Sequence, residues 1–318
     1  MSSIYYPYFR GKQFELIAVR ENAHRIQQGG ICPIIEPVRE SLSSLRRTIE
    51  SLHRENAEFI IVANPMHGDH AESDMEGDGG ILEEAIRGGT GASLGYLLRE
   101  ETPLREVQDF LSRHVASPVS MIHYGFADAR GLSGILADAE AIREHIFIED
   151  FCPKLYQRSF RNPKRVLVRD GFKKRRNREY PSEEMFSELH LTYLDEGMGG
   201  FGDFLMVGDE YSEAGGPAWA VAIHLSYLSP DREDLMMVRH FVSDRIDTPT
   251  DPGGKYLEAL RKLVAFADAP NSPVLTTEAM EEFRSQNREQ HFPGLGYVKK
   301  LSMQHHMDTL AEFLSRTR

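Results

Sequence analysis

Short apolar runs alternate with amphipathic stretches along most of the chain. Runs with the length of a strand span 31–36, 59–63, 93–98, 118–124, 145–149 and 164–170, and a seventh begins at 204–207. Apolar residues three or four positions apart, the pattern of a helix with one buried face, occur in 41–54, 81–87, 103–114, 135–144 and 185–194. This alternation predicts a parallel sheet whose strands are connected by covering helices.

The alternation ends after the seventh run. Two long β-like runs, 218–228 and 235–243, are separated by a short turn and predict a hairpin. Helical patterns follow at 254–266, 278–285 and 306–316. The 318 residues exceed the roughly 250 of a typical (β/α) barrel. We therefore expect one domain over residues 1–318: a TIM-like (β/α)8 barrel with an N-terminal extension, a hairpin insertion near the last strands and C-terminal helices.

Composition narrows the classes of partner. Lys and Arg number 37 against 49 Asp and Glu, a net charge of −12, which repels a polyanion unless basic residues cluster locally. Two cysteines are too few for a secreted disulfide framework. No signal peptide and no apolar run of about 20 residues is recognisable. These features predict a cytoplasmic protein without a membrane partner.

Polar residues end several of the predicted strands. In a parallel barrel the carboxyl ends of the strands converge on one face, so these side chains become neighbours. Together they supply the groups needed for acid/base catalysis or for a hard divalent cation. Taken singly, each is explained as well by capping of the following helix. The residues are Glu36, Asn64, His123, Glu149 with Asp150, and Arg169 with Asp170.

Four of the candidates carry alternatives of their own. Glu36 ends an apolar strand, so its carboxylate must face solvent or be paired in the barrel mouth. His123 is a candidate base, although a lone histidine on a buried strand is more often a hydrogen-bonded core residue. The same alternatives apply to His224, which the hairpin can bring next to His240 as a pair of imidazoles. Asp203 lies between aromatic residues at a strand entrance and is a further site candidate.

A dense basic run follows the sixth predicted strand. It spans residues 173–178 with Arg178 at its end, and its residues Lys173, Lys174, Arg175 and Arg176 are suited to a phosphate, a nucleic acid or an acidic protein surface. A solvated surface loop is the alternative. The sequence contains neither a phosphate-binding Gly-rich loop with Lys and Ser/Thr nor a Gly-x-Ser-x-Gly motif. P-loop nucleotide hydrolysis and serine hydrolase chemistry are therefore disfavoured.

Several motifs resemble a known family. They are residues 5–18, 33–38, 166–172, 177–181, 200–204, 220–227, 240–244 and 300–306. They resemble an uncharacterised bacterial family related to the phage "beta protein" group, whose members are similar to (β/α) barrels. The resemblance implies a gene on a mobile element beside a predicted restriction-endonuclease-like nuclease, and hence a role in antiviral defence or element maintenance. The family's recurring polar positions are matched by Arg10, Glu15, Glu36, Asn64, Asp170, Asn177, Asp203, His224 and His240.

Two functions follow as hypotheses, and the sequence leaves open whether the protein is an enzyme. The first is a metal-assisted hydrolase of a phosphodiester or nucleotide, using Mg²⁺ or Mn²⁺. Its catalytic residues would be Glu36, Asp170, His123 and His224, and its metal ligands Glu36, Asp170 and Asp203. Its substrate-binding residues would be Arg10, Asn64, Arg169, Lys173, Lys174, Arg175 and Arg176. The second hypothesis is a non-catalytic sensor or regulatory module that binds the partner nuclease.

Overall fold

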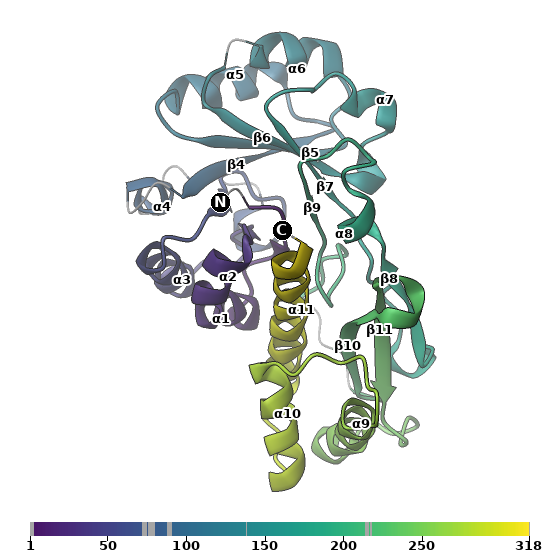
Figure 1. Ribbon diagram of the computed structural model, residues 1–318. Helices are drawn as coiled ribbons and strands as arrows, with labels where there is room; N and C mark the ends of the chain where they lie inside the picture. The colour runs from purple at the N-terminus through teal and green to yellow at the C-terminus, as the bar shows by residue number, and fades with distance from the viewer. Residues whose placement is uncertain are drawn as a thin grey trace. The chain divides into compact units, whose positions relative to one another are not determined.

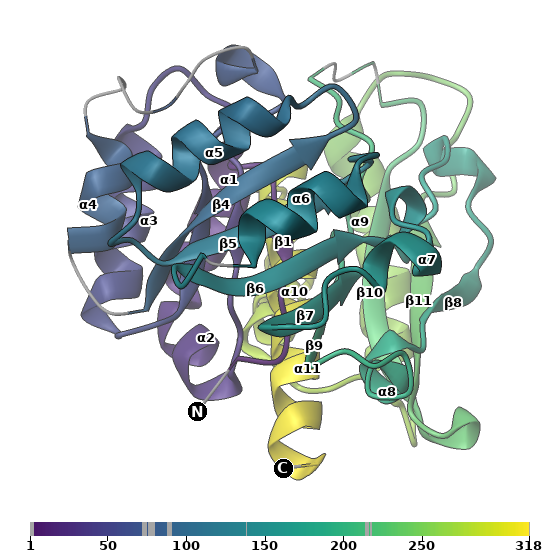
Figure 2. The ribbon, with the colours of Figure 1, turned by 90° about the horizontal axis from the view of Figure 1, so that it is seen from above.

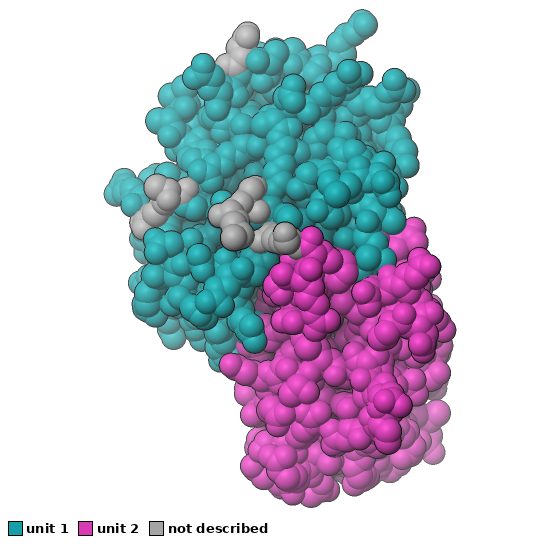
Figure 3. Space-filling model, in the orientation of Figure 1, with its two compact units in different colours: residues 1–169, 189–203 teal, residues 170–188, 204–318 magenta. Residues whose placement is uncertain are grey.

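The chain divides into two compact units. The structure is a computed structural model that describes residues 3–71, 75, 80–87, 91–137, 139–213, 216 and 218–317. Unit 1 comprises residues 1–169 and 189–203, and unit 2 comprises residues 170–188 and 204–318 (Figure 3). The predicted hairpin and C-terminal helices, which the sequence analysis treats as additions to a single domain, form most of unit 2.

Unit 1 contains an eight-stranded parallel sheet. Its strands, in spatial order, are β1 Tyr8–Phe9, β2 Ile34–Ile35, β3 Phe59–Val62, β4 Ala92–Arg99, β5 Val119–Tyr124, β6 Ile142–Ile148, β7 Lys164–Val168 and β9 Gly200–Gly202. The backbone N–H of Tyr6 donates to the carbonyl of Phe201 at 2.8 Å, and that of Tyr8 donates to the carbonyl of Asp203 at 2.9 Å. These bonds join the two edge strands into a nearly closed barrel, and the predicted fold class is confirmed.

Helices cover the outside of this barrel. They are α1 Gln13–Glu21, α2 Ala23–Gly29, α3 Ser43–Arg54, α4 Ile81–Arg87, α5 Leu104–Arg113, α6 Ala129–Leu136, α7 Lys154–Gln157 and α8 Leu189–Thr192. Figure 2 shows α5 and α6 lying over β4, β5 and β6. Tyr96 of β4 packs its ring 4.5 Å from that of Phe110 on α5, so this face of the strand points outwards. The alternate residues of each strand fill the barrel interior.

Two short strands, β1 and β9, were not predicted. The N-terminal segment, expected as an extension, supplies β1, and the seventh strand lies at 200–202 rather than at 204–207. At Gly202 a Cβ atom would lie 2.1 Å from the carbonyl oxygen of Tyr6. The approach of β9 to β1 therefore requires glycine, and a three-residue strand with two glycines has no apolar signal.

Two predicted helices are also corrected. The helix expected at 135–144 is α6, which begins after the N-cap Asp128 and ends at Leu136, because β6 already starts at Ile142. The Asp128 side chain accepts a hydrogen bond from Gly131 N at 2.9 Å, which fixes the earlier start. The segment 185–194 is shared between strand β8 (Glu183–Ser187) and helix α8.

Unit 2 packs a small antiparallel sheet against helices. The sheet has the order β10 (Ala222–Ser229), β11 (Leu235–Val242) and β8, and the predicted hairpin is confirmed as β10 and β11. Figure 1 shows these strands with helices α9 Pro252–Ala267, α10 Glu278–Glu289 and α11 Leu295–Thr317. Ile223, Leu225, Leu260, Phe283 and Leu301 belong to their shared apolar core. None of the described helices is both long and apolar enough to cross a bilayer.

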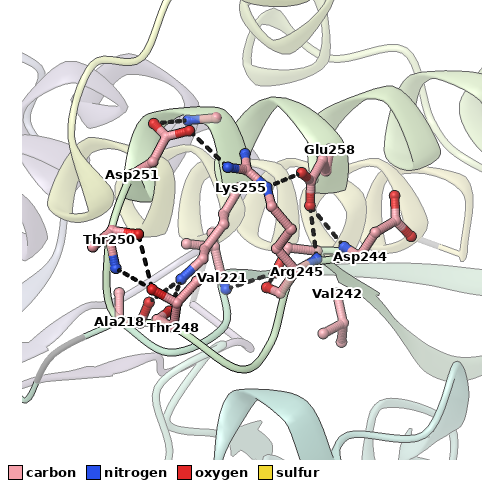
Figure 4. Close-up of polar contacts among 12 residues, drawn as sticks. Ala218, Val221, Val242, Asp244, Arg245, Thr248, Thr250, Asp251, Lys255 and Glu258 are labelled. Atoms are coloured by element: carbon pink, nitrogen blue, oxygen red, sulfur yellow. Dashed lines mark hydrogen bonds and ion pairs between the residues drawn. The ribbon is translucent and has the colours of Figure 1, made fainter.

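A buried lysine ties α9 to the segments that flank the hairpin. Lys255 is 0% exposed, and its Nζ donates to the carbonyl oxygens of Ala218 at 2.9 Å and Trp219 at 3.0 Å, and to that of Thr248 (Figure 4). All three donors of the ammonium group are thus used by backbone acceptors, which offsets the cost of burying its charge. The contacts explain a buried charge in unit 2 without a ligand.

Candidate functional site

Glu36 lies at the centre of a buried polar cluster in unit 1. It follows β2 and is 0% exposed. Its Oε2 accepts hydrogen bonds from Tyr8 Oη at 3.1 Å and Arg10 Nη1 at 3.2 Å. Its Oε1 accepts from Met66 N at 2.8 Å and lies 3.0 Å from His67 Nδ1. Four donors therefore converge on one carboxylate at the carboxyl end of a barrel strand.

These donors keep Glu36 ionised. Burial by itself raises the pKa of a carboxyl group. Here the hydrogen bond from His67, the charges of Arg10 and His67, and the N–H of Met66 outweigh burial, and the pKa of Glu36 lies below its ordinary value. An ionised carboxylate is only an acceptor, so His67 Nδ1 carries the proton in the contact between them.

Two glycines allow the loops that carry these partners to approach Glu36. Gly11 has φ +61° and Gly68 has φ +72°, both in the left-handed region. A Cβ atom on Gly11 would lie 2.6 Å from the carbonyl oxygen of Glu36, and one on Gly68 would lie 2.1 Å from that of Val38. Both contacts are shorter than any side chain tolerates. Glycine thus holds the arginine and the histidine at close range to the carboxylate.

Arg10 is itself positioned from two sides. Its guanidinium lies 4.6 Å from the centre of the Tyr8 ring, and the residue is 4% exposed. Its backbone N–H donates to Glu15 Oε2 at 2.6 Å. Burial raises the pKa of Glu15, while the charge of Lys12 and the N–H of Arg10 oppose that rise. The predicted substrate-binding residue Arg10 therefore lies within the Glu36 cluster.

Asn64 and Arg169 have partners within unit 1. The Asn64 side chain donates from Nδ2 to the carbonyl of Leu97 at 2.9 Å and accepts from Leu97 N at 2.7 Å, as a neighbouring strand would. Arg169 binds Glu149 with two hydrogen bonds, Nε to Oε2 at 2.5 Å and Nη2 to Oε1 at 2.8 Å. The amide of Asn64 orders the end of β3, and the guanidinium of Arg169 orders the ends of β6 and β7.

His123 lies in an aromatic cluster on the outer face of β5. Its Nε2 is 2.9 Å from His145 Nδ1, and its Nδ1 is 2.7 Å from the hydroxyl of Tyr156 on α7. The rings of Phe147 and Phe160 pack at 4.7 and 4.6 Å. Burial, and secondarily the charge of His145, place the pKa of His123 well below its ordinary value. These contacts are those of the core histidine that the sequence analysis gave as the alternative.

The three predicted metal-binding carboxylates all accept hydrogen bonds from protein donors. Asp203 Oδ1 accepts from Tyr5 Oη at 2.9 Å in unit 1. In unit 2, Asp170 accepts from Phe172 N at 2.9 Å and Asp209 N at 2.8 Å, one bond on each oxygen. Within the described part of the chain, no group of three or more His, Cys, Asp or Glu residues is placed to hold a metal ion. The metal site stays a prediction.

The basic run is matched by acidic side chains of unit 2. Lys174 Nζ lies 2.9 Å from Glu210 Oε1, and Arg176 Nη1 lies 3.9 Å from Glu179 Oε1. Lys173 and Arg175 both pair with Glu184 of β8. Arg175 does so through two hydrogen bonds, and Lys173 Nζ lies 3.9 Å from Glu184 Oε2. Local pairing reduces the net positive charge that the run presents to a polyanion.

His224 and His240 meet across the hairpin, as the sequence suggests. They are register partners on β10 and β11, and their Nδ1 atoms are 2.7 Å apart. His240 Nε2 lies 3.2 Å from Glu184 Oε1. Burial, followed by the charges of His240 and Lys299, places the pKa of His224 well below its ordinary value. Burial also lowers the pKa of His240, although Glu184 opposes this.

Two members of the Glu36 cluster were missed from the sequence. His67 stands three residues after Asn64, close to the end of β3, where the strand-end rule already applied to its neighbour. The residues after it are polar and rich in glycine, so no apolar pattern extends the strand as far as His67. Tyr8 was missed because β1 is too short to show a strand pattern.

Comparison with protein-family models gives no match, and comparison with curated protein sequences gives none either. The resemblance to the phage "beta protein" group therefore stays a prediction.

Proposed function

We propose that unit 1 is a hydrolase in which His67, oriented by Glu36, acts as the general base. One observation carries the proposal: the Nδ1 atom of His67 lies 3.0 Å from a carboxylate that is fully buried and ionised at the carboxyl end of a barrel strand. Active sites of (β/α) barrels form at this end. The arrangement is the carboxylate–imidazole pair found in many hydrolases.

The pair has a defined chemistry. Because Nδ1 of His67 donates to Glu36, a neutral imidazole has its lone pair on Nε2, the form that accepts a proton from water or a hydroxyl group. The buried negative charge of Glu36 then stabilises the imidazolium that forms. Arg10 and Tyr8 hold the carboxylate from the opposite oxygen, so its orientation is fixed before substrate binds.

We propose a phosphodiester or nucleotide-like compound as the substrate. Arg10 balances the negative charge of Glu36, so the buried pair adds no net negative charge that would repel an anionic substrate. The family resemblance supports the same class, since a gene beside a nuclease on a mobile element fits nucleic acid or nucleotide turnover in antiviral defence.

The test is hydrolysis of a chromogenic phosphodiester, nucleotides, and single- and double-stranded nucleic acids by purified protein of measured metal content. His67→Gln should lower kcat about 100-fold or more, the usual contribution of a general base. Glu36→Gln should lower it as well. His24→Gln is the matched control, because His24 Nδ1 also lies 3.0 Å from a carboxylate, that of Glu55, but its side chain is 65% exposed.

Turnover that is equal in wild type and His67→Gln would refute the assignment of the base. Absence of turnover with all substrates would instead favour the second hypothesis, a regulatory module that binds a partner nuclease. Copurification of the two proteins would then be the decisive measurement.

A further inference from the structure

Unit 2 contains a chain of four side chains with defined hydrogen-bond directions. Arg175 binds both oxygens of Glu184, Glu184 contacts Nε2 of His240, and Nδ1 of His240 contacts Nδ1 of His224. The four residues come from the segment before β8 and from β8, β11 and β10. We call them the Glu184 relay. None of them belongs to the Glu36 cluster, so the inference does not depend on the proposed function.

The aromatic surroundings hold the two imidazoles in place. The ring of Tyr180 stacks on His240 with centroids 4.6 Å apart and packs against His224 at the same distance. Phe172 meets His224 edge-on at 4.9 Å. The hydroxyl of Tyr180 accepts a hydrogen bond from Arg175 N at 3.1 Å, which links this aromatic wall to the start of the relay.

The carboxylate of Glu184 determines which nitrogen of each histidine in the relay carries a proton. Arg175 lowers the pKa of Glu184 against the opposing effect of burial, so the carboxylate is ionised and only accepts. Nε2 of His240 must then be the donor, and a neutral His240 has its lone pair on Nδ1. Nδ1 of His224 donates to that lone pair. A neutral His224 consequently has its own lone pair on Nε2.

His224 is half-buried, and no hydrogen bond to its Nε2 is found among the residues that the structure describes. Lys299 of α11 acts on it with a positive charge. The positive charge of Arg175 acts on the neighbouring His240. An acceptor atom in a positive field is suited to a ligand that is an anion and also carries a proton to donate.

We propose that the Glu184 relay makes His224 Nε2 the acceptor of a ligand site in unit 2, specific for a singly charged oxyanion that still carries a proton, such as dihydrogen phosphate or the monoanion of a phosphate monoester. The ligand's P–O–H donates to Nε2, and its negative charge is attracted by the positive charge of Lys299. A fully deprotonated anion of the same shape lacks the donor and leaves two acceptors facing each other.

The first measurement is nitrogen-15 NMR of the protein with labelled histidine, which distinguishes the two neutral forms of each ring. His224 should be protonated on Nδ1 and His240 on Nε2. Inorganic phosphate at about pH 6, where it is largely singly charged, should shift the His224 signals at concentrations about tenfold lower than sulfate does. Sulfate is the control anion, because it has the same shape and no proton at this pH.

Glu184→Gln should abolish the preference for phosphate over sulfate. Glu183→Gln is the matched control on the same strand, since the hydrogen bonds of Glu183 to Tyr227 and Arg239 lie outside the relay. It should retain the preference. If Glu184→Gln does not fold, His240→Phe removes the acceptor for His224 Nδ1 and tests the same step. Protonation of His224 on Nε2, equal effects of the two anions, or no effect of either would each overturn the proposal.

Discussion

Each unit places an imidazole against a carboxylate, and the two carboxylates differ in their surroundings. In unit 1, Glu36 is 0% exposed and meets one imidazole, His67, together with three other donors. In unit 2, the side chain of Glu184 is 14% exposed and meets His240, which contacts a second imidazole. An arginine fixes the carboxylate in both units.

The difference separates two roles of a carboxylate that contacts an arginine and a histidine. At Glu36 the four donors surround the carboxylate, so removing it leaves a buried guanidinium without its counter-charge. At Glu184 the carboxylate is close to solvent, and its main effect is to determine which nitrogen of each histidine carries a proton. We therefore expect stability to depend chiefly on the first carboxylate and ligand binding to depend chiefly on the second.

The largest expected effect is on stability. Glu36→Ala takes from the buried Arg10 the carboxylate that lies 3.2 Å away, and should lower the free energy of unfolding by about 3–5 kcal/mol. Glu184→Ala should cost about 1–2 kcal/mol, because Arg175 is 30% exposed and can regain water. Urea denaturation followed by circular dichroism measures both. Equal losses in the two variants would contradict the comparison.

A smaller effect concerns two glycines, one in each unit, whose Cβ atom would meet a backbone carbonyl oxygen. Gly68→Ala should cost about 2–3 kcal/mol, because the residue has φ +72° and its Cβ would meet the carbonyl of Val38 at 2.1 Å. In unit 2, Gly171→Ala places its Cβ 2.5 Å from the carbonyl of Phe186 without a positive φ, and should cost about 1 kcal/mol less. Thermal unfolding of both variants measures the difference, and the reverse order would refute the argument.

The sequence predicted the parts of the fold that have a strong apolar pattern. Strands β3, β5 and β7 coincide closely with predicted apolar runs, and the hairpin follows from two long runs with a short turn between them. Strands β1 and β9 were missed because closing the barrel takes only two and three residues there. These two strands pair because the barrel closes, and the local pattern of apolar residues carries no information about that closure.

The site was predicted residue by residue but not as a network. Glu36 and Arg10 were identified, the first from its place at a strand end and the second from the family motif. The contact of Glu36 with His67 spans 31 positions, and no local pattern encodes it. For Asn64 the sequence identified the position at a strand end but not the partner. Its amide forms hydrogen bonds with the backbone of Leu97.

The smallest effect is the pH dependence of stability, and it separates the two clusters by pH. The pKa of Glu36 in the folded protein lies below the ordinary value of 4.5, so its contribution is present above about pH 4.5 and is lost as the pH falls through the folded value. The pKa of His224 lies below 6.5, and protonation of the unfolded chain therefore weakens the fold from about pH 6.5 downwards. Relative to wild type, His224→Gln should gain up to about 1 kcal/mol of stability between pH 6.5 and 4.5. Glu36→Gln should gain only below pH 4.5. Urea midpoints at a series of pH values measure both differences, and a gain in the same pH range for the two variants would show that the clusters do not titrate separately.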